Sequence, residues 1–312
     1  WSDISMKIYL NEFIHPDAAS HLRSQAEVVT NFDHIEELDG IIVRGTQVTG
    51  EMIRAAKSLK VIGRHGIAMN IIDLDAAREC GVRVLNTPRT NANSVAEYIV
   101  GCFLAMSRHF YECNLKLRRG AFTRIAPPDL LGSDVSGKTV GLVGMGNISQ
   151  LVAKIMRNAF DCEICGYDPF VDNERAAALG FKKYERLEDL LEVSDLVNIS
   201  VPLSKGTVGL VSGDMFRHFK PGAILVNAAR GQIVNEDGLY CALTEGPLKA
   251  AAFDTFAVEP LPKDSKLLTL ENFSATPHIG GNTEEALYRT GMAVVDNVIN
   301  VIKGQPADGI IV

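Results

Sequence analysis

A glycine-rich turn between a predicted strand and a predicted helix constrains the fold of this chain more than any other feature. The residues from Lys138 to Ser149 read Lys-Thr-Val-Gly-Leu-Val-Gly-Met-Gly-Asn-Ile-Ser. Gly144 permits a tight turn, and Gly146 lets the backbone approach a bound phosphate closely. The N-terminus of the following helix attracts anions through its free N–H groups and its dipole. The pattern predicts a parallel α/β sheet that holds a dinucleotide, although Ser149 replaces the third glycine of the usual fingerprint.

An acidic residue strengthens this interpretation and indicates which dinucleotide binds. The strand predicted after the helix ends at Gly166-Tyr167-Asp168, and Pro169 follows. A carboxylate at that point accepts hydrogen bonds from the adenosine ribose hydroxyls and repels a 2′-phosphate. The alternative is a solvated turn acid before a proline. The strand–turn–helix–strand context favours the cofactor role, so the sequence predicts NAD rather than NADP.

Short apolar runs alternate with helical patterns along the chain, which is typical of parallel sheets covered on both faces. A first series of strands is predicted at residues 7–10, 27–31, 41–43, 61–63 and 82–85. A second series is predicted at residues 139–143, 163–167, 196–200, 223–227, 250–253 and 273–276. Helices are predicted at residues 16–25, 50–59, 73–80, 94–108 and 284–303, the fourth opened by Ser94 and Glu97 in capping-box spacing.

These two series predict an α/β fold of two Rossmann- or flavodoxin-like lobes with parallel sheets and a cleft between them. Asn86-Thr87-Pro88 breaks the first series, and the amphipathic helix at the end of the chain would return to the first lobe. We therefore predict a discontinuous substrate (catalytic) domain of residues 6–91 and 285–312. Residues 92–284 would form the NAD-binding Rossmann domain.

Composition and charge exclude several classes of protein. The 312 residues are 46% hydrophobic and 22% charged, an ordinary globular composition long enough for two domains. A formal net charge of −7 argues against nucleic-acid binding. No apolar run approaches the ~18 residues of a membrane-spanning helix, and the sequence shows no signal-peptide pattern.

The cysteines are scattered and do not suggest a disulfide framework, so we predict a reducing, cytoplasmic location. They are Cys80, Cys102, Cys113, Cys162, Cys165 and Cys241. Cys162 and Cys165 have C-x-x-C spacing but lie in a predicted strand, where residues three apart point to opposite faces. The pattern therefore favours a structural role over a redox or metal site, and we expect no metal.

Three polar residues in the second half of the chain supply the groups of an acid–base site. Arg230 follows a predicted strand, Glu259 precedes Pro260, and His278 lies in a Thr-Pro-His loop. A guanidinium binds a carboxylate with two parallel hydrogen bonds, an imidazole transfers a proton near neutral pH, and an acid sets the protonation of that imidazole.

These motifs together resemble the D-isomer-specific 2-hydroxyacid dehydrogenases, a family that includes D-3-phosphoglycerate dehydrogenase. The resemblance covers nearly all of residues 6–312. It rests on Val43-Arg44-Gly45, Val61-Ile62-Gly63-Arg64, Asn86-Thr87-Pro88, Val95-Ala96-Glu97, Gly137-Lys138-Thr139, residues 227–231, Asp254, Glu259-Pro260 and residues 276–281. So many motifs in family order are highly specific.

The resemblance implies a role for each residue of the site. Arg230 would bind the substrate carboxylate and polarise the C2 oxygen, His278 would be the general acid and base, and Glu259 would orient His278. Asp254 would contact the carboxamide end of NAD. Further cofactor contacts are implied for Gly144, Gly146, Asn147, Ile148, Asp168, Val201, Ala228, Gly280 and Gly281. Substrate contacts are implied for Arg44, Gly45 and Arg64 along with Arg230.

The implied activity is NAD-dependent hydride transfer at C2 of a 2-hydroxy acid, with a 3-phosphoglycerate-like acid favoured because Arg44 and Arg64 suit a phosphate. The alternatives are a hydroxypyruvate or glyoxylate reductase and, from another class, a non-catalytic NAD(H)-sensing protein like the corepressors of this family. Asn70-Ile71 departs from the family's Asp-Asn pair. The sequence resembles the short form without a regulatory domain, and we expect a homodimer with residues 94–132 at the interface.

Overall fold

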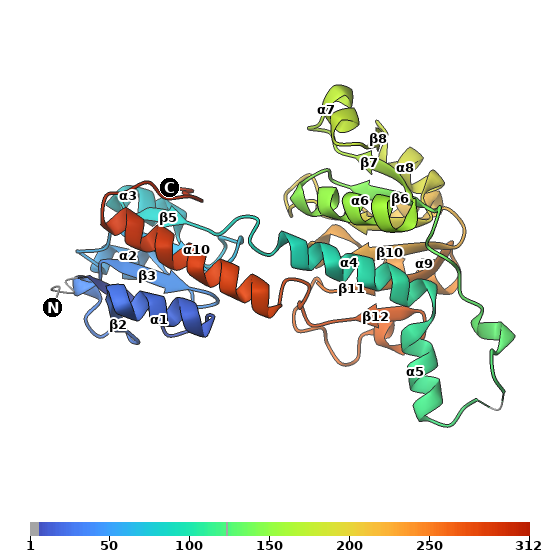
Figure 1. Cartoon of the computed structure of the whole chain (residues 1–312), viewed down its shortest axis with the longest axis horizontal. Coiled ribbons are helices and arrows are strands. Elements are labelled where there is room, and N and C mark those ends of the chain that lie inside the picture. The colour runs from blue at the N-terminus through green and yellow to red at the C-terminus, as the bar shows by residue number, and fades with distance from the viewer. Residues whose placement is uncertain (1–5, 123) are drawn as a thin grey trace. The chain divides into compact units, whose positions relative to one another are not determined.

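The computed structural model describes residues 6–122 and 124–312, and the chain divides into two compact units (Figure 1). The first unit combines residues 6–91 with Asn282–Val312, and the second is Ala92–Gly281. The predicted α/β fold with two parallel sheets is confirmed. The cleft expected between the lobes and the roles given to the two domains stay predictions.

The first unit contains a five-stranded parallel sheet in the order β2-β1-β3-β4-β5, which is the flavodoxin-like order. Its strands are β1 (Lys7–Tyr9), β2 (Glu27–Val29), β3 (Gly40–Val43), β4 (Val61–Arg64) and β5 (Arg83–Leu85). Its helices are α1 (Pro16–Gln25), α2 (Gly50–Ala55), α3 (Leu74–Cys80) and α10 (Glu284–Ile302), with a 3-10 turn at Ile35–Glu37.

Alternating side chains of these strands build two separate cores. Ile8 and Ile42 face α1 and α10, whereas their neighbours Tyr9 and Ile41 face α2 and α3. Successive residues of a strand point to opposite faces, so continuous apolar strands require cover on both. Gly81 ends α3 in the left-handed conformation at φ 69°, the usual conformation of a glycine at the C-terminal end of a helix.

The second unit contains a seven-stranded parallel sheet in the order β12-β11-β10-β9-β6-β7-β8. Its strands are β6 (Thr139–Val143), β7 (Glu163–Tyr167), β8 (Lys182–Lys183), β9 (Leu196–Ile199), β10 (Ala223–Asn227), β11 (Leu248–Phe253) and β12 (Phe273–Ala275). Its helices are α4 (Ala92–Ser107), α5 (Phe110–Arg118), α6 (Asn147–Phe160), α7 (Asn173–Ala178), α8 (Leu187–Val193) and α9 (Glu236–Thr244). Its 3-10 turns are Pro128–Leu130, Gly213–His218, Gly231–Ile233 and Lys266–Thr269.

The strand order of this sheet reverses between β6 and β9, and ligands of such sheets bind at this switch point. Helices α4 and α6 cover one face of the sheet, and α8 and α9 cover the other. Cys162 packs with the α4 and α6 side and Cys165 with the α8 and α9 side. The two thiols therefore lie on opposite faces, as predicted, and burial raises the pKa of Cys165 to about 11.

Two local expectations are corrected by the structure. Helix α4 begins at Ala92, so Ser94 lies inside the helix and does not cap it. Helix α2 ends at Ala55 rather than continuing to residue 59. Helix α5 and the short edge strand β8 were not predicted. None of the helices within the described residues has the length and apolar character needed to cross a membrane.

Candidate cofactor and active site

The predicted dinucleotide turn joins β6 to α6 at the switch point of the second sheet. Gly144 has φ 93°, and a Cβ on it would lie 2.7 Å from the carbonyl oxygen of Ser200 and 3.0 Å from Cγ1 of Val201. Only glycine fits this backbone and this close approach. Gly146 precedes α6 without a side-chain cap, and a Cβ there would meet nothing within 4 Å. The first residues of α6, Asn147 and Ile148, thus begin a helix whose N-terminus has room for an anion.

Asp168 lies directly after β7, where the predicted ribose-binding acid belongs. Its Oδ1 accepts the N–H of Phe170 at 2.9 Å, and its Oδ2 accepts the N–H of Met145 at 3.0 Å. These bonds fix the half-buried carboxylate beside the glycine turn. Ionised carboxylates accept up to about four hydrogen bonds, so the group retains acceptor capacity for ribose hydroxyls.

Val201, Ala228 and Asp254 follow β9, β10 and β11 in the chain, so they share the carboxyl-terminal edge of the parallel sheet. Asp254 is only 2% exposed. Its Oδ1 accepts the Ile279 N–H and its Oδ2 accepts the Gly280 N–H, each at 2.7 Å. The carboxylate therefore holds the loop after β12, and its contact with NAD stays a prediction.

His278 and Glu259 form a direct pair in this unit. His278 Nδ1 lies 2.9 Å from Glu259 Oε2, and the side chains are 49% and 38% exposed. The other carboxylate oxygen of Glu259 accepts the N–H of Phe256 at 3.0 Å. The carboxylate is thus anchored on one side and orients the imidazole on the other, leaving Nε2 of His278 for a proton transfer.

Several forces act on the pKa of Glu259. Partial burial opposes ionisation and would raise the pKa, but hydrogen bonds from His278 and Phe256 and the positive charge of Arg230 outweigh it. The pKa of Glu259 is therefore lowered, and the group is a carboxylate at neutral pH.

Arg230 lies in a turn after β10. The sequence predicted its place after a strand, but not the side chain that shapes the turn. Its Nη1 donates to the carbonyl oxygen of Ala229 at 2.6 Å. The fully buried amide of Asn227 accepts the Ala229 N–H at 3.0 Å and donates to the Arg230 carbonyl at 3.1 Å. Asn227 thus shapes the turn that presents the guanidinium. Asn side chains often bond the backbone of the turn that follows them. Asn227 could have been recognised in the sequence on this ground, but its role was not predicted.

The candidate substrate residues of the first unit follow β3 and end β4. The carboxylate of Glu12 accepts the backbone N–H groups of Arg44, Gly45 and Thr46 at 2.6, 2.5 and 3.2 Å. Burial would raise the pKa of Glu12, but these three bonds outweigh it and lower the pKa. Glu12 was not predicted, and it organises the loop that carries Arg44.

The two arginines of the first unit differ in how far they are already engaged. Arg64 donates from Nε to the Ala68 carbonyl at 3.0 Å and from Nη1 to the His65 carbonyl at 2.7 Å. Burial, followed by the charge of Arg44, lowers the pKa of Arg64 although Glu12 opposes this. Within the part of the chain that the structure describes, the guanidinium of Arg44 makes one long contact of 3.3 Å, from Nη1 to the Phe13 carbonyl. Arg44 is therefore the freer of the two cations.

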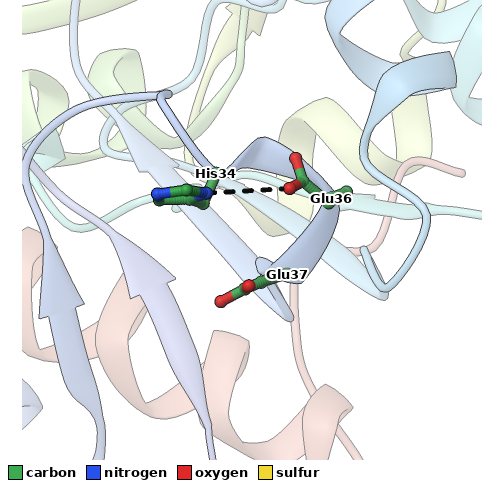
Figure 2. Close-up of side chains that lie close together, drawn as sticks. All are labelled: His34, Glu36 and Glu37. Carbon is green, nitrogen blue, oxygen red and sulfur yellow. Dashed lines mark ion pairs between the residues drawn. The ribbon is translucent and has the colours of Figure 1, made fainter.

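One group of metal-ligand side chains lies outside these sites. His34, Glu36 and Glu37 gather on the surface of the first unit at the 3-10 turn (Figure 2). His34 Nδ1 lies 3.7 Å from Glu36 Oε1, and Lys7 Nζ lies 2.5 Å from Glu37 Oε2. All three side chains are exposed and one carboxylate is neutralised by a lysine, so the group carries no metal assignment.

The fold and the site together define a protein with a dinucleotide-binding α/β unit and an imidazole–carboxylate pair beside a guanidinium. Residues 100–280 match the model of the "D-isomer specific 2-hydroxyacid dehydrogenase, NAD binding domain". The chain belongs to the D-isomer specific 2-hydroxyacid dehydrogenase family, and the residues that match this model lie within its second unit.

Similar proteins span several activities of the family. A D-3-phosphoglycerate dehydrogenase of Methanocaldococcus jannaschii is 37% identical over 98% of the chain, which spans 59% of that relative's length. A hydroxypyruvate reductase of Thermotoga maritima is 37% identical over 94% of the chain and 97% of the relative. The crystal structure of the TT0316 protein of Thermus thermophilus has a TM-score of 0.90 and 31% identity, covering 98% of this chain and all of that one (100%).

Proposed function

We propose that this chain is an NAD-dependent D-2-hydroxyacid dehydrogenase, which moves a hydride between C2 of a 2-hydroxy acid and the nicotinamide ring. The observation that carries the proposal is the 2.9 Å pairing of His278 with Glu259 in the unit that holds the dinucleotide turn. An imidazole held by a carboxylate is suited to general acid–base catalysis near neutral pH.

Each member of the site has one task in this proposal. His278 takes the proton of the C2 hydroxyl at Nε2 and returns it in the reductive direction. Glu259 holds the imidazole through Nδ1. Arg230 binds the carboxylate and draws electron density from the C2 oxygen, which a planar guanidinium does better than a lysine. NAD, when bound, supplies the hydride acceptor.

The residues of the second unit fit NAD. The open N-terminus of α6 at Gly146 suits a pyrophosphate, and Asp168 suits ribose hydroxyls. Val201, Ala228, Gly280 and Gly281 are proposed to line the cofactor at the same sheet edge. Asp254 is proposed to accept a hydrogen bond from the carboxamide of NAD. It would do so in addition to the bonds that its carboxylate already accepts from the loop.

A panel of 2-hydroxy and 2-keto acids, assayed by NADH absorbance, tests this function. Turnover with any of them at ordinary enzyme concentration supports the proposal. Tight NADH binding without turnover of any acid would instead place the chain with the non-catalytic NAD(H)-sensing members of another class.

Within this function we propose a 3-phosphoglycerate-like substrate. Arg44 lies in the loop after β3 that the Glu12 carboxylate holds, and among the described residues most donors of its guanidinium have no partner. Arginine donors match phosphate geometry. Hydroxypyruvate or glyoxylate is the second candidate. It is favoured because Arg64 already donates two hydrogen bonds to carbonyl groups of its own loop, which leaves fewer donors for a phosphate.

Comparing 3-phosphohydroxypyruvate with hydroxypyruvate in the reductive direction decides between these substrates. A phosphate contact predicts about tenfold or more higher kcat/KM for the phosphorylated acid. Arg44→Ala should erase the preference, whereas Arg64→Ala should impair both acids because it disrupts the loop. A better rate with hydroxypyruvate would make the chain a small-acid reductase.

We also propose a homodimer built on residues 94–132. This segment exposes large apolar side chains that a monomer seldom presents together. They are Phe110, Tyr111, Leu115, Leu117, Ile125 and Leu131, with exposures of 59, 46, 50, 68, 94 and 81%. Light scattering should give a dimeric mass at micromolar concentration, and Leu117→Glu should shift it toward monomer. A monomeric mass for the unmodified chain would contradict the proposal.

The cytoplasm is the compartment that we propose. All six cysteines are free thiols, which a reducing compartment preserves. Thiol titration of the protein isolated from its native cells should find six thiols, and disulfides would oppose the assignment.

A further inference from the structure

A chain of three side chains connects helix α4 to the loop that carries His278. The Tyr98 hydroxyl in α4 lies 2.6 Å from Oγ1 of Thr276, and Thr276 Oγ1 donates to Asp254 Oδ1 at 2.7 Å. A hydroxyl has one proton to donate. Since Thr276 gives its proton to Asp254, Tyr98 donates to Thr276, and the chain runs in one direction from the helix to the carboxylate.

Asp254 in turn binds the backbone of His278 and of the two residues that follow it. Its carboxylate accepts the N–H groups of Ile279 and Gly280, and its backbone carbonyl accepts the His278 N–H at 2.9 Å. His278 itself has φ 56°, a left-handed conformation that a non-glycine residue keeps only where its surroundings enforce it. The bonds to Asp254 supply that enforcement.

The ring of Tyr98 also lies beside the loop. A Cβ on Gly280 would lie 3.4 Å from Tyr98 Cδ1 and 2.9 Å from Asp254 Oδ2. The ring and the carboxylate thus enclose Gly280 from two sides. Burial raises the pKa of Tyr98 well above its usual range, so the hydroxyl keeps its proton and remains a donor.

We propose that Tyr98 is a positioning residue that acts through Thr276 and Asp254 to hold the His278 loop where the imidazole meets Glu259. The inference rests on the acid–base role proposed for His278. If the link between helix and sheet is purely structural, loss of the Tyr98 hydroxyl should lower only the stability of the fold. If Tyr98 positions the loop, the same loss should also lower kcat, and this effect should require His278.

A double-mutant cycle separates these two outcomes. Tyr98→Phe removes the hydroxyl and keeps the ring, and we expect kcat to fall about tenfold, which is a larger change than that in the NADH dissociation constant. In a His278→Ala background the same change should leave the residual rate unaltered, because the group it acts through is gone. Tyr184→Phe, which removes a hydroxyl from the β8 edge of the same sheet, is the matched control. Multiplicative losses in the cycle would overturn the proposal.

A second measurement needs neither cofactor nor turnover. Amide hydrogen exchange across residues 276–281 of the cofactor-free protein should quicken at Ile279 and Gly280 in Tyr98→Phe and in Thr276→Val, whereas Thr276→Ser should restore most of the protection. Thr276→Val serves if Tyr98→Phe does not fold. If exchange is faster in the variants but the unmodified protein turns over no acid, the positioning role is supported and the proposed function is refuted. Unchanged exchange in both variants would refute the positioning role.

Discussion

The backbone N–H of Met145, inside the glycine turn, donates to the carboxylate of Asp168 at the end of the neighbouring strand. This bond holds a negative charge beside the glycine turn, where we propose that the adenosine ribose of the cofactor binds. We therefore expect NAD to be used far better than NADP, as judged by kcat/KM for the two cofactors. Asp168→Ala should narrow the difference. Equal values for the unmodified protein would refute this reading of Asp168.

His278→Ala should remove most of the turnover and leave NADH binding intact, because the imidazole moves a proton and does not hold the dinucleotide. General acid–base catalysis typically contributes roughly 10²–10⁴-fold. Steady-state kinetics and fluorescence titration of NADH measure the two properties separately. A variant with nearly normal kcat would remove His278 from the mechanism.

His65 gives the first unit a dependence on pH. Its side chain is buried at 7% exposure, and this burial, aided by the charge of Arg44, lowers its pKa from 6.5 to about 4. The unfolded chain therefore binds more protons between these values, so stability is complete above pH 6.5 and declines as pH falls toward 4. Urea titrations at pH 7 and pH 5 should differ by on the order of 2 kcal/mol. His65→Gln should flatten this dependence, and an unchanged slope would contradict the assignment.

Ser149 carries a buried hydroxyl that has no partner among the described residues. The carbonyl four residues earlier, on Met145, is already taken by Gln150 Nε2 at 2.9 Å. Ser149→Ala should therefore leave the free energy of unfolding unchanged or raise it by about 1 kcal/mol. Ser194→Ala is the matched control, since that hydroxyl donates to the Leu190 carbonyl at 2.6 Å and its loss should cost about 1 kcal/mol. Similar losses in both variants would show that Ser149 has a partner.

The regular parts of the fold were predictable because strands buried on both faces leave continuous apolar runs, and both parallel sheets show them. The errors fall where local patterns compete. Ser94 and Glu97 have capping-box spacing, yet α4 starts two residues earlier, at the buried Ala92. Helix α5 carries exposed apolar residues in place of a buried stripe, so its periodicity gave no clear signal.

Within the candidate site, residues with strong chemistry were predictable and those that hold them were not. Arg230, Glu259 and His278 stand out as charged or ionisable residues at predicted loops. Glu12 and Tyr98 act on groups far away in the sequence, and a single sequence does not reveal such partners. The pairing of Tyr98 with Thr276, for example, exists only once α4 has packed on the sheet.

The discontinuity of the first unit fixes an order in which the chain can fold. Helix α10 supplies Val294, Val295, Val298 and Ile299 to the core of that unit, packed on strands made more than two hundred residues earlier along the 312-residue chain. The second unit is continuous and holds every residue that it needs once Gly281 has been synthesised. The lobe that begins first therefore finishes last, and one apolar face of its sheet is covered only by α1 while the dinucleotide lobe folds.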